Sequence, residues 1–237
     1  MRDLHPLRGE RNFAWRGIQV SRVEALSDMV FAFALTLLVV SEAPPRSFAE
    51  LIEQLWGFPG FAAGFAILLL IWHSHYIYFR RYALEDGWAS ALNAGLLFLI
   101  LFLVYPLKYL ATMLSQFVRS LAFASPQAPL TLAESQQALI LLSVGYAGVF
   151  LMFAALYAHA LGREKQLGLT AQERALTWFS FWQQAVHMSV AALVAVVAAL
   201  LPIHASPYAG FLYCLIGPLI VIAGLFVPAW TRESARA

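Results

Sequence analysis

Three residues that could do chemistry stand close together at one end of an apolar segment. Arg22, Ser27 and Asp28 precede the uncharged run Met29–Val40, which is 12 residues long. At about 1.5 Å per residue this run cannot cross a hydrocarbon core of about 30 Å, so a helix that spans a membrane here must include the charged residues. Those groups must then face protein, water or lipid headgroups. Alternatively, Asp28 pairs with a neighbouring group and Arg22 extends to the headgroups, so that the charges are tolerated without a functional role.

Within the run, Phe33, Leu37 and Val40 recur at spacings of four and three, which places them on one face of a helix. Thr36 lies beside that face. Such a stripe is typical of helix packing. The same residues could also form a narrow hydrophobic constriction that stops ions by dewetting. One chain cannot surround an axis with a single stripe, so the second interpretation requires an oligomer with this helix at its centre.

Two histidines and one asparagine lie in later apolar runs. His73 and His75 point about 200° apart on a helix, so they cannot bind the same metal ion. We expect His75 to be a hydrogen-bonding anchor and Asn93 to hydrogen-bond between helices. The single cysteine, Cys214, excludes an intramolecular disulfide and a thiolate metal cage. The sequence therefore predicts no metal site.

Signatures of enzymes are missing from the sequence. It contains no nucleophile–base pair, P-loop, dinucleotide fingerprint or metalloprotease spacing. We therefore expect no catalytic residue, no cofactor and no enzymatic activity. The net charge of +2 is too small to indicate a nucleic-acid partner.

The composition identifies the elements that must position these residues. Hydrophobic residues make up 61% of the 237 residues and charged residues 12%, whereas a soluble domain has about 45–50% and about 25%. So few charges cannot coat a water-facing surface of this size. The sequence predicts an all-α polytopic membrane protein with the lipid bilayer as its partner.

Long uncharged runs predict a single domain over residues 1–237 with six transmembrane helices. Pro202 and Pro207 divide the longest run into two spans. The predicted spans cover residues 21–41, 57–79, 88–110, 135–161, 176–201 and 208–230. With six spans, 12 basic side chains fall on the side of the two termini and 3 on the other. This asymmetry predicts that both termini are cytoplasmic.

The stretch from Arg22 to Leu38 resembles the signature of the transmembrane protein 175 family, which has Arg-x-x-x-Phe-Ser-Asp followed by an apolar run and Thr-Leu-Leu. Trp72–His75 resembles that family's Trp-x-x-His element, and Asn93–Pro106 its third span. Two positions depart from the pattern, because Leu26 replaces a phenylalanine and Phe33 an isoleucine.

The resemblance implies a potassium-permeable cation channel in a bacterial plasma membrane, a homotetramer whose first helices line a central pore. K⁺ would be the permeant ion. It implies a constriction at Phe33, Leu37 and Val40, and a role for Thr36 in potassium preference. It also implies a polar network of Arg22, Ser27 and Asp28 near the cytoplasmic pore mouth.

Two other functions remain open. A proton- or solute-coupled transporter would use Asp28 together with His187 in the fifth span. A non-conducting membrane scaffold would use the polar residues of the first helix for assembly alone.

Overall fold

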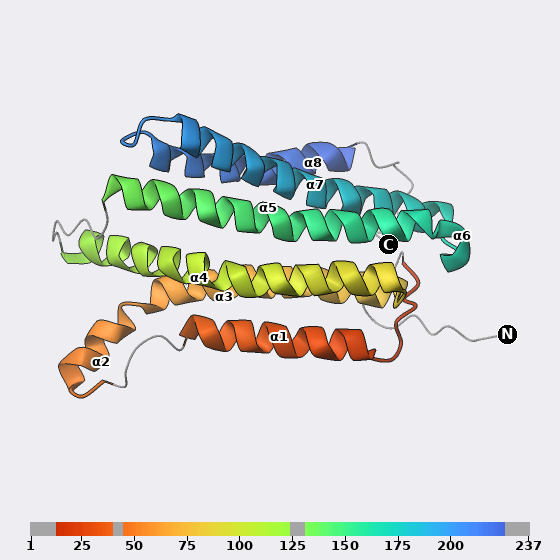
Figure 1. Ribbon diagram of the computed structural model, residues 1–237, viewed down its shortest axis with the longest axis horizontal. Coiled ribbons are helices and arrows are strands. Elements are labelled where there is room, and N and C mark those ends of the chain that lie inside the picture. The colour runs from red at the N-terminus through yellow and green to blue at the C-terminus, as the bar shows by residue number, and fades with distance from the viewer. Residues whose placement is uncertain (1–12, 40–44, 124–130, 226–237) are drawn as a thin grey trace.

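The computed structural model describes residues 13–39, 45–123 and 131–225 of the chain (Figure 1). This part of the chain is helical and contains no strand. In chain order its elements are α1 (Arg22–Val39), α2 (Phe48–Leu55), α3 (Phe58–Tyr82), α4 (Gly87–Phe123), α5 (Leu132–Gly162), α6 (Glu164–Leu167), α7 (Ala171–Leu200), the 3₁₀ helix η1 (Ser206–Leu215) and α8 (Ile216–Leu225).

The long helices run along one another in a bundle (Figure 1). Helix α1 packs against α3 and α4, α4 packs against α5, and α5 packs against α7, which also contacts η1 and α8. Helix α1 therefore lies on one side of the bundle, and α7 and α8 lie on the opposite side (Figure 1).

Five helical stretches of the described chain are long and apolar enough to cross a membrane: Phe58–Tyr82, Gly87–Ser115, Leu132–Gly162, Ala171–Leu200 and Ser206–Leu225. They overlap the last five predicted spans. Helix α1 lies where the first span was predicted. It is not among these five stretches, and its 18 residues include Arg22, Glu24 and Asp28. A sixth span therefore stays a prediction. Residues 40–41 and 226–230 of the predicted spans lie outside the described residues.

The structure differs from the predicted elements in two places. The short helix α2, between the first two predicted spans, was missed. Its signal is in the sequence, since four apolar residues follow helical spacing (Phe48, Leu51, Ile52 and Leu55) and Ser47 accepts a hydrogen bond from the Glu50 N–H at 3.2 Å. Helix α4 also extends beyond the predicted end at residue 110 to Phe123, with Pro106 inside it.

The extension of α4 packs closely against the start of α3. A Cβ atom on Gly60 would lie 1.7 Å from the carbonyl oxygen of Ala111, so only glycine permits this approach. The Gly60 N–H donates to the Ser115 hydroxyl at 2.9 Å, and that hydroxyl donates to the Gly57 carbonyl at 2.9 Å. These bonds hold α3 and α4 together beyond the predicted span.

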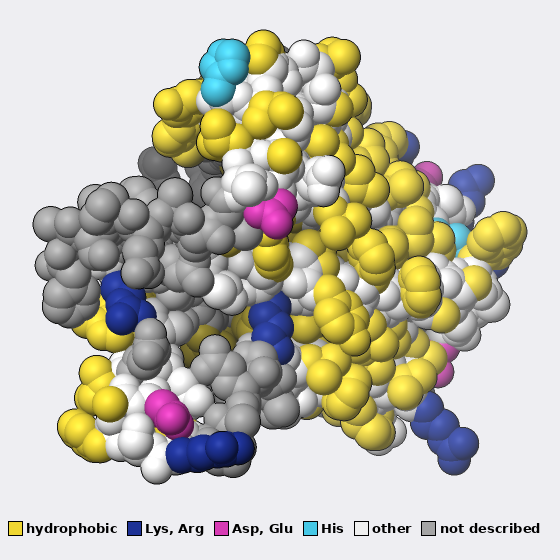
Figure 2. All heavy atoms as spheres, turned by 60° about the vertical axis from the view of Figure 1, so that its left-hand side comes forward, with side chains coloured by type: hydrophobic (Ala, Val, Ile, Leu, Met, Phe, Trp, Pro, Cys, Tyr) yellow, Lys and Arg dark blue, Asp and Glu magenta, His cyan; other side chains and the backbone are white. Residues whose placement is uncertain are grey.

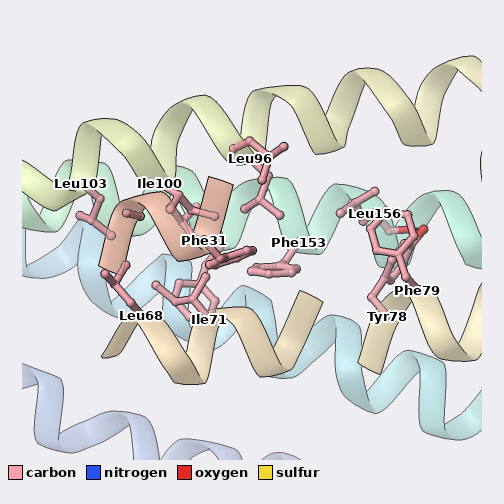
Figure 3. Close-up of a cluster of buried hydrophobic side chains, with 14 of the residues drawn as sticks. Phe31, Leu68, Ile71, Tyr78, Phe79, Leu96, Ile100, Leu103, Phe153 and Leu156 are labelled. Carbon is pink, nitrogen blue, oxygen red and sulfur yellow. The ribbon is translucent and has the colours of Figure 1, made fainter. Parts of the chain in front are cut away.

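One large apolar cluster joins α1, α3, α4 and α5 (Figure 3). Phe31 of α1 points into this cluster, which includes Ile71 of α3, Ile100 of α4 and Phe153 of α5. The outer surface is also apolar, and hydrophobic side chains cover much of the described surface in Figure 2. Contiguous exposed apolar surface is unusual for a protein in water but is expected of helices in lipid.

The segment before α1 fastens the bundle at one end. Arg16 forms an ion pair with Glu173 at the start of α7 (3.1 Å), and its Nε donates to the Leu167 carbonyl at 2.9 Å. The Ala14 N–H donates to the same carboxylate at 3.0 Å. The Gly17 N–H donates to the Arg80 carbonyl at 3.1 Å. The starts of α1 and α7 and the end of α3 are therefore at the same end of the molecule.

Candidate functional site

Helix α1 has one buried and one exposed face. The buried side chains recur at spacings of three and four, namely Glu24, Ser27, Phe31, Ala34 and Leu38. The exposed ones recur in the same way, namely Arg22, Leu26, Met29, Phe33 and Thr36. Because α3 and α4 cover the first face, the second is available for contacts outside the described chain.

The predicted constriction residues differ in their surroundings. Phe33 is 56% exposed. Leu37 is half-buried and packs against the apolar cluster that contains Phe31. Thr36 is on the exposed face with Phe33, and its hydroxyl donates to the Phe33 carbonyl at 2.7 Å. Val40 lies outside the described residues.

A chain of buried hydrogen bonds fixes α1 against its neighbours. Ser27 donates to the Val23 carbonyl at 2.8 Å and accepts from Asn93 Nδ2 on α4 at 3.0 Å. The Asn93 Oδ1 lies 2.9 Å from His75 Nε2 on α3. An amide oxygen only accepts hydrogen bonds, so His75 carries its proton on Nε2. His75 and Asn93 therefore take part in hydrogen bonds between α1, α3 and α4.

The predicted trio of Arg22, Ser27 and Asp28 is not brought together. Ser27 belongs to the buried chain, whereas Asp28 is exposed and accepts a hydrogen bond from Trp72 Nε1 on α3 at 2.9 Å. Arg22 is exposed and has no hydrogen-bond or ion-pair partner within the part of its own chain that the structure describes. Within the described chain these three side chains do not bond to one another, and the network that the resemblance implies stays a prediction.

Trp72 and Glu24 also contribute to the site, although neither was among the predicted site residues. Trp72 ties Asp28 to α3, and its signal was the tryptophan of the Trp72–His75 element. Glu24 is buried and caps α1, because its carboxylate accepts from the Ser21 N–H at 2.9 Å while Ser21 Oγ accepts from the Glu24 N–H at 3.1 Å. The Glu24 carboxylate also lies 3.8 Å from the Arg80 guanidinium.

The far end of α1 has a cationic partner. Lys108 on α4 donates from Nζ to the Leu37 carbonyl at 3.4 Å. A cation beside the last carbonyl groups of a helix complements the negative end of the helix dipole. Helix α1 is thus held at its start by Ser21 and Glu24, in its first half by Ser27 and Asp28, and near its end by Lys108.

His187 lies away from these residues. It is on α7, its Nδ1 is 2.9 Å from the Tyr146 hydroxyl, and its ring stacks on Phe150 at 4.4 Å between ring centroids. Helix α7 packs on α5, whereas Asp28 on α1 packs toward α3. The structure therefore does not join Asp28 and His187 into one transport site. Among the described residues, no group of three or more His, Cys, Asp or Glu side chains could hold a metal ion.

Known proteins share both the sequence and this arrangement of helices. Residues 22–103 match the family described as endosomal/lysosomal potassium channel TMEM175. A potassium channel of Marivirga tractuosa is 35% identical over 231 residues, which cover 94% of this chain and 93% of that protein. This chain belongs to the TMEM175 family. The family resemblance seen in the sequence is thereby confirmed.

Further members of the TMEM175 family extend the comparison. A potassium channel of Chamaesiphon minutus is 30% identical over 165 residues, 65% of this chain and 71% of that protein. The crystal structure of a variant of the potassium channel MtTMEM175, in complex with a Nanobody-MBP fusion protein, has a TM-score of 0.83 and 30% identity. That match covers 97% of this chain and 99% of the other. TMEM175 is a family of potassium channels and not of enzymes, and this member is an integral membrane protein.

The part of the chain that matches the TMEM175 family contains the anchors of α1. Residues 22–103 include α1, α3 and the first part of α4. They therefore hold Ser27, His75 and Asn93 as well as the Asp28–Trp72 bond.

Proposed function

We propose that this chain is a subunit of a homotetrameric potassium-permeable leak channel in which α1 of each copy lines a central pore. The observation that carries the proposal is the exposed face of α1 in a member of a potassium channel family. Its residues recur at alternating spacings of four and three, so they form one continuous stripe that can face copies of the helix around an axis. Helices α3 and α4 already cover the opposite face.

A central position of α1 accounts for its unusual composition. Arg22, Glu24 and Asp28 are costly against lipid. At the axis of a tetramer the neighbouring subunits and the pore water surround Arg22 and Asp28 instead, while Glu24 is buried within its own subunit. On this proposal α1 crosses the membrane as the first of six spans in the single domain of residues 1–237. The 12-to-3 asymmetry of basic residues then places both termini in the cytoplasm of a bacterial cell.

Phe33, Leu37 and Val40 form the constriction in this proposal. The structure describes Phe33 and Leu37, and Phe33 is the more exposed of the two. Four copies of its ring around an axis would leave a narrow apolar passage, which holds water poorly and so resists ions. Leu37 packs partly against its own subunit and would line the passage with the remaining part of its side chain.

Thr36 would supply oxygen atoms next to this constriction. Its hydroxyl proton is directed to the Phe33 carbonyl at 2.7 Å. The oxygen keeps lone pairs that can face outward, because a hydroxyl accepts as well as donates. A ring of four such oxygens could replace part of the hydration of K⁺ and favour it over ions that hold water more tightly.

The decisive experiment joins assembly and conduction in one preparation. Purified protein in detergent should form particles with four-fold symmetry whose central helix is α1. The same preparation, placed in liposomes loaded with potassium, should release potassium down its gradient faster than empty liposomes do. Particles with α1 on the lipid-facing rim, or intact tetramers without potassium release, would contradict the proposal. Saturable flux that stops in Asp28→Asn would indicate a transporter instead.

A further inference from the structure

The connection between α5 and α7 encloses a hollow on the surface of the bundle. Its volume is about 700 Å³, and its lining includes Lys165, Gly168, Ala171, Arg174 and Trp178. Three small residues, Gly168, Ala171 and Ala175, form part of its lining. Gly168 ends α6 in a left-handed conformation with φ of 58°, and a Cβ placed there would meet no atom within 4 Å.

The rim of the hollow has an excess of positive charge. Arg174 pairs with Glu164 at 3.0 Å, and its side chain is 57% exposed. The Lys165 side chain is exposed and makes no ion pair or hydrogen bond in the part of the chain that the structure describes. One acidic and two basic side chains therefore leave a single positive charge at this rim to be neutralised by a ligand.

The helix that carries Arg174 becomes apolar and aromatic in the next two turns. Trp178 is 43% exposed and Trp182 is 55% exposed, and both follow Arg174 at steps of four on the same face of α7. Tryptophan is enriched at the boundary between headgroups and hydrocarbon. The order along α7 is thus a basic rim, an aromatic boundary and an apolar surface, which matches the order of phosphate, glycerol and acyl chain in a phospholipid.

The position of the hollow in the bundle also fits a lipid. The ion pair between Arg16 and Glu173 brings the start of α7 to the same end of the molecule as the start of α1. The described basic residues concentrate at this end, which the orientation proposed above assigns to the cytoplasmic leaflet, the one rich in anionic lipids. The hollow is lined by α6 and the first turns of α7, and α6 lies at the end of the bundle (Figure 1).

We propose that this hollow binds the headgroup of an anionic glycerophospholipid of the cytoplasmic leaflet, with its phosphate at Lys165 and Arg174 and its glycerol region against Trp178. The proposal goes beyond ion conduction and does not depend on it. A zwitterionic lipid would fill the same space but would leave the excess charge at the rim unneutralised.

Competition between two lipids tests this site. The full-length protein in detergent is incubated with an equimolar mixture of phosphatidylglycerol and phosphatidylcholine with the same acyl chains. Retained lipid is then counted by native mass spectrometry. The unmodified protein should prefer phosphatidylglycerol by about fivefold or more, the effect expected of one uncompensated cation. Lys165→Gln should reduce that preference about fivefold, and Lys165→Gln with Arg174→Gln should abolish it.

Two matched variants separate the site from general charge and from folding. Arg46→Gln removes the same charge from an exposed residue near α2, far along the chain from the hollow, and should leave the preference unchanged. Glu164→Gln releases Arg174 from its partner and should increase the preference, which a merely structural residue would not do. Lys165→Gln breaks no side-chain hydrogen bond or ion pair in the described chain, so it remains informative even if the double variant fails to fold.

Three results would overturn the proposal. The first is equal retention of the two lipids by the unmodified protein. The second is an unchanged preference in Lys165→Gln. The third is full displacement of phosphatidylglycerol by millimolar inorganic phosphate, which would identify a simple anion site.

Discussion

Asn93 on α4 donates a hydrogen bond to Ser27 on α1 across 3.0 Å, and both side chains are buried. Because Ser27 must face α4 to accept this bond, the rotation of α1 about its axis is restricted. Phe33 is six residues further along α1 and is consequently turned outward. The contact between Ser27 and Asn93 therefore connects the packing of the subunit with the surface that we propose lines the pore.

Asn93→Leu keeps the branched shape and the number of non-hydrogen side-chain atoms but removes the bonds to both Ser27 and His75. Each hydrogen bond between membrane helices contributes about 1 kcal/mol, so we expect a loss of about 2 kcal/mol in the free energy of unfolding. For a chain of this size that corresponds to a fall of about 5 °C in the unfolding midpoint. Thermal unfolding in detergent measures it. Ser74→Ala is the control, because that hydroxyl bonds only to the Leu70 carbonyl of its own helix. An equal midpoint in both variants would mean that the Asn93 bonds contribute nothing.

Phe33→Ala should increase potassium release from liposomes, since it widens the proposed constriction and lets it hold water. A decrease of about 1.4 kcal/mol in the barrier raises the rate about tenfold. The control is Phe98→Ala, which removes the same ring from an exposed position on α4. Unchanged release and an unchanged potassium-to-sodium ratio in Phe33→Ala would remove Phe33 from the pore.

Thr36→Val replaces the hydroxyl by a methyl group of nearly the same size. We expect the potassium-to-sodium permeability ratio, measured from reversal potentials in planar bilayers, to fall toward one while conduction persists. Thr112→Val is a close match, because Thr112 is also exposed on a helix and its hydroxyl donates to the Lys108 carbonyl at 3.1 Å. The proposed role of Thr36 would be wrong if both variants kept the ratio of the unmodified channel.

Arg16→Gln should destabilise the protein, because it leaves Glu173 without its charged partner. The side chains of Arg16 and Glu173 are 22% and 4% exposed. Removing one partner of a buried ion pair lowers the free energy of unfolding by about 3–5 kcal/mol. The loss is smaller here because Arg16 still reaches water. Glu164→Gln breaks the more exposed pair with Arg174 and should cost less than about 1 kcal/mol. Chemical unfolding in lipid-free detergent compares the two. Equal costs would show that burial does not strengthen the Arg16–Glu173 pair.

The Asp86 carboxylate makes the free energy of unfolding depend on pH. The Ala89 N–H donates to the Asp86 carboxylate, and together with His159 and Arg163 this lowers the Asp86 pKa below its ordinary value of 3.8. A lowered pKa means that the contribution of Asp86 is complete above pH 3.8 and is lost as the pH falls through the lower value in the folded protein. The unfolding midpoint should therefore fall below about pH 4. Asp86→Asn should flatten this part of the profile, whereas an unaltered profile in Asp86→Asn would assign the acid sensitivity to other groups.

Much of the secondary structure was predictable because it depends on residues close in sequence. Apolar runs indicated the helices, and the spacing of Ser21 and Glu24 is that of a capping box at the start of α1. Thr170 and Glu173 form the same box at the start of α7. The helix begins at Ala171, before the predicted start of the span at residue 176, because that span was drawn from the uncharged run that follows Arg174. Helix α2 had a comparable local signal that was overlooked, since attention went to runs long enough to span a membrane.

The sequence by itself determined that the chain is helical and apolar enough for a membrane, and its motif from Arg22 to Leu38 determined the family. Local hydrogen bonding and the hydrophobic effect suffice for the first result, because both act on neighbouring residues. Only the tertiary structure decided which face of α1 is exposed, that Asp28 bonds to Trp72 and not to Arg22, and that Arg16 reaches Glu173. These contacts join residues that are 44 to 157 positions apart. Their formation depends on how whole helices rotate and pack against one another, which no local pattern of residues specifies.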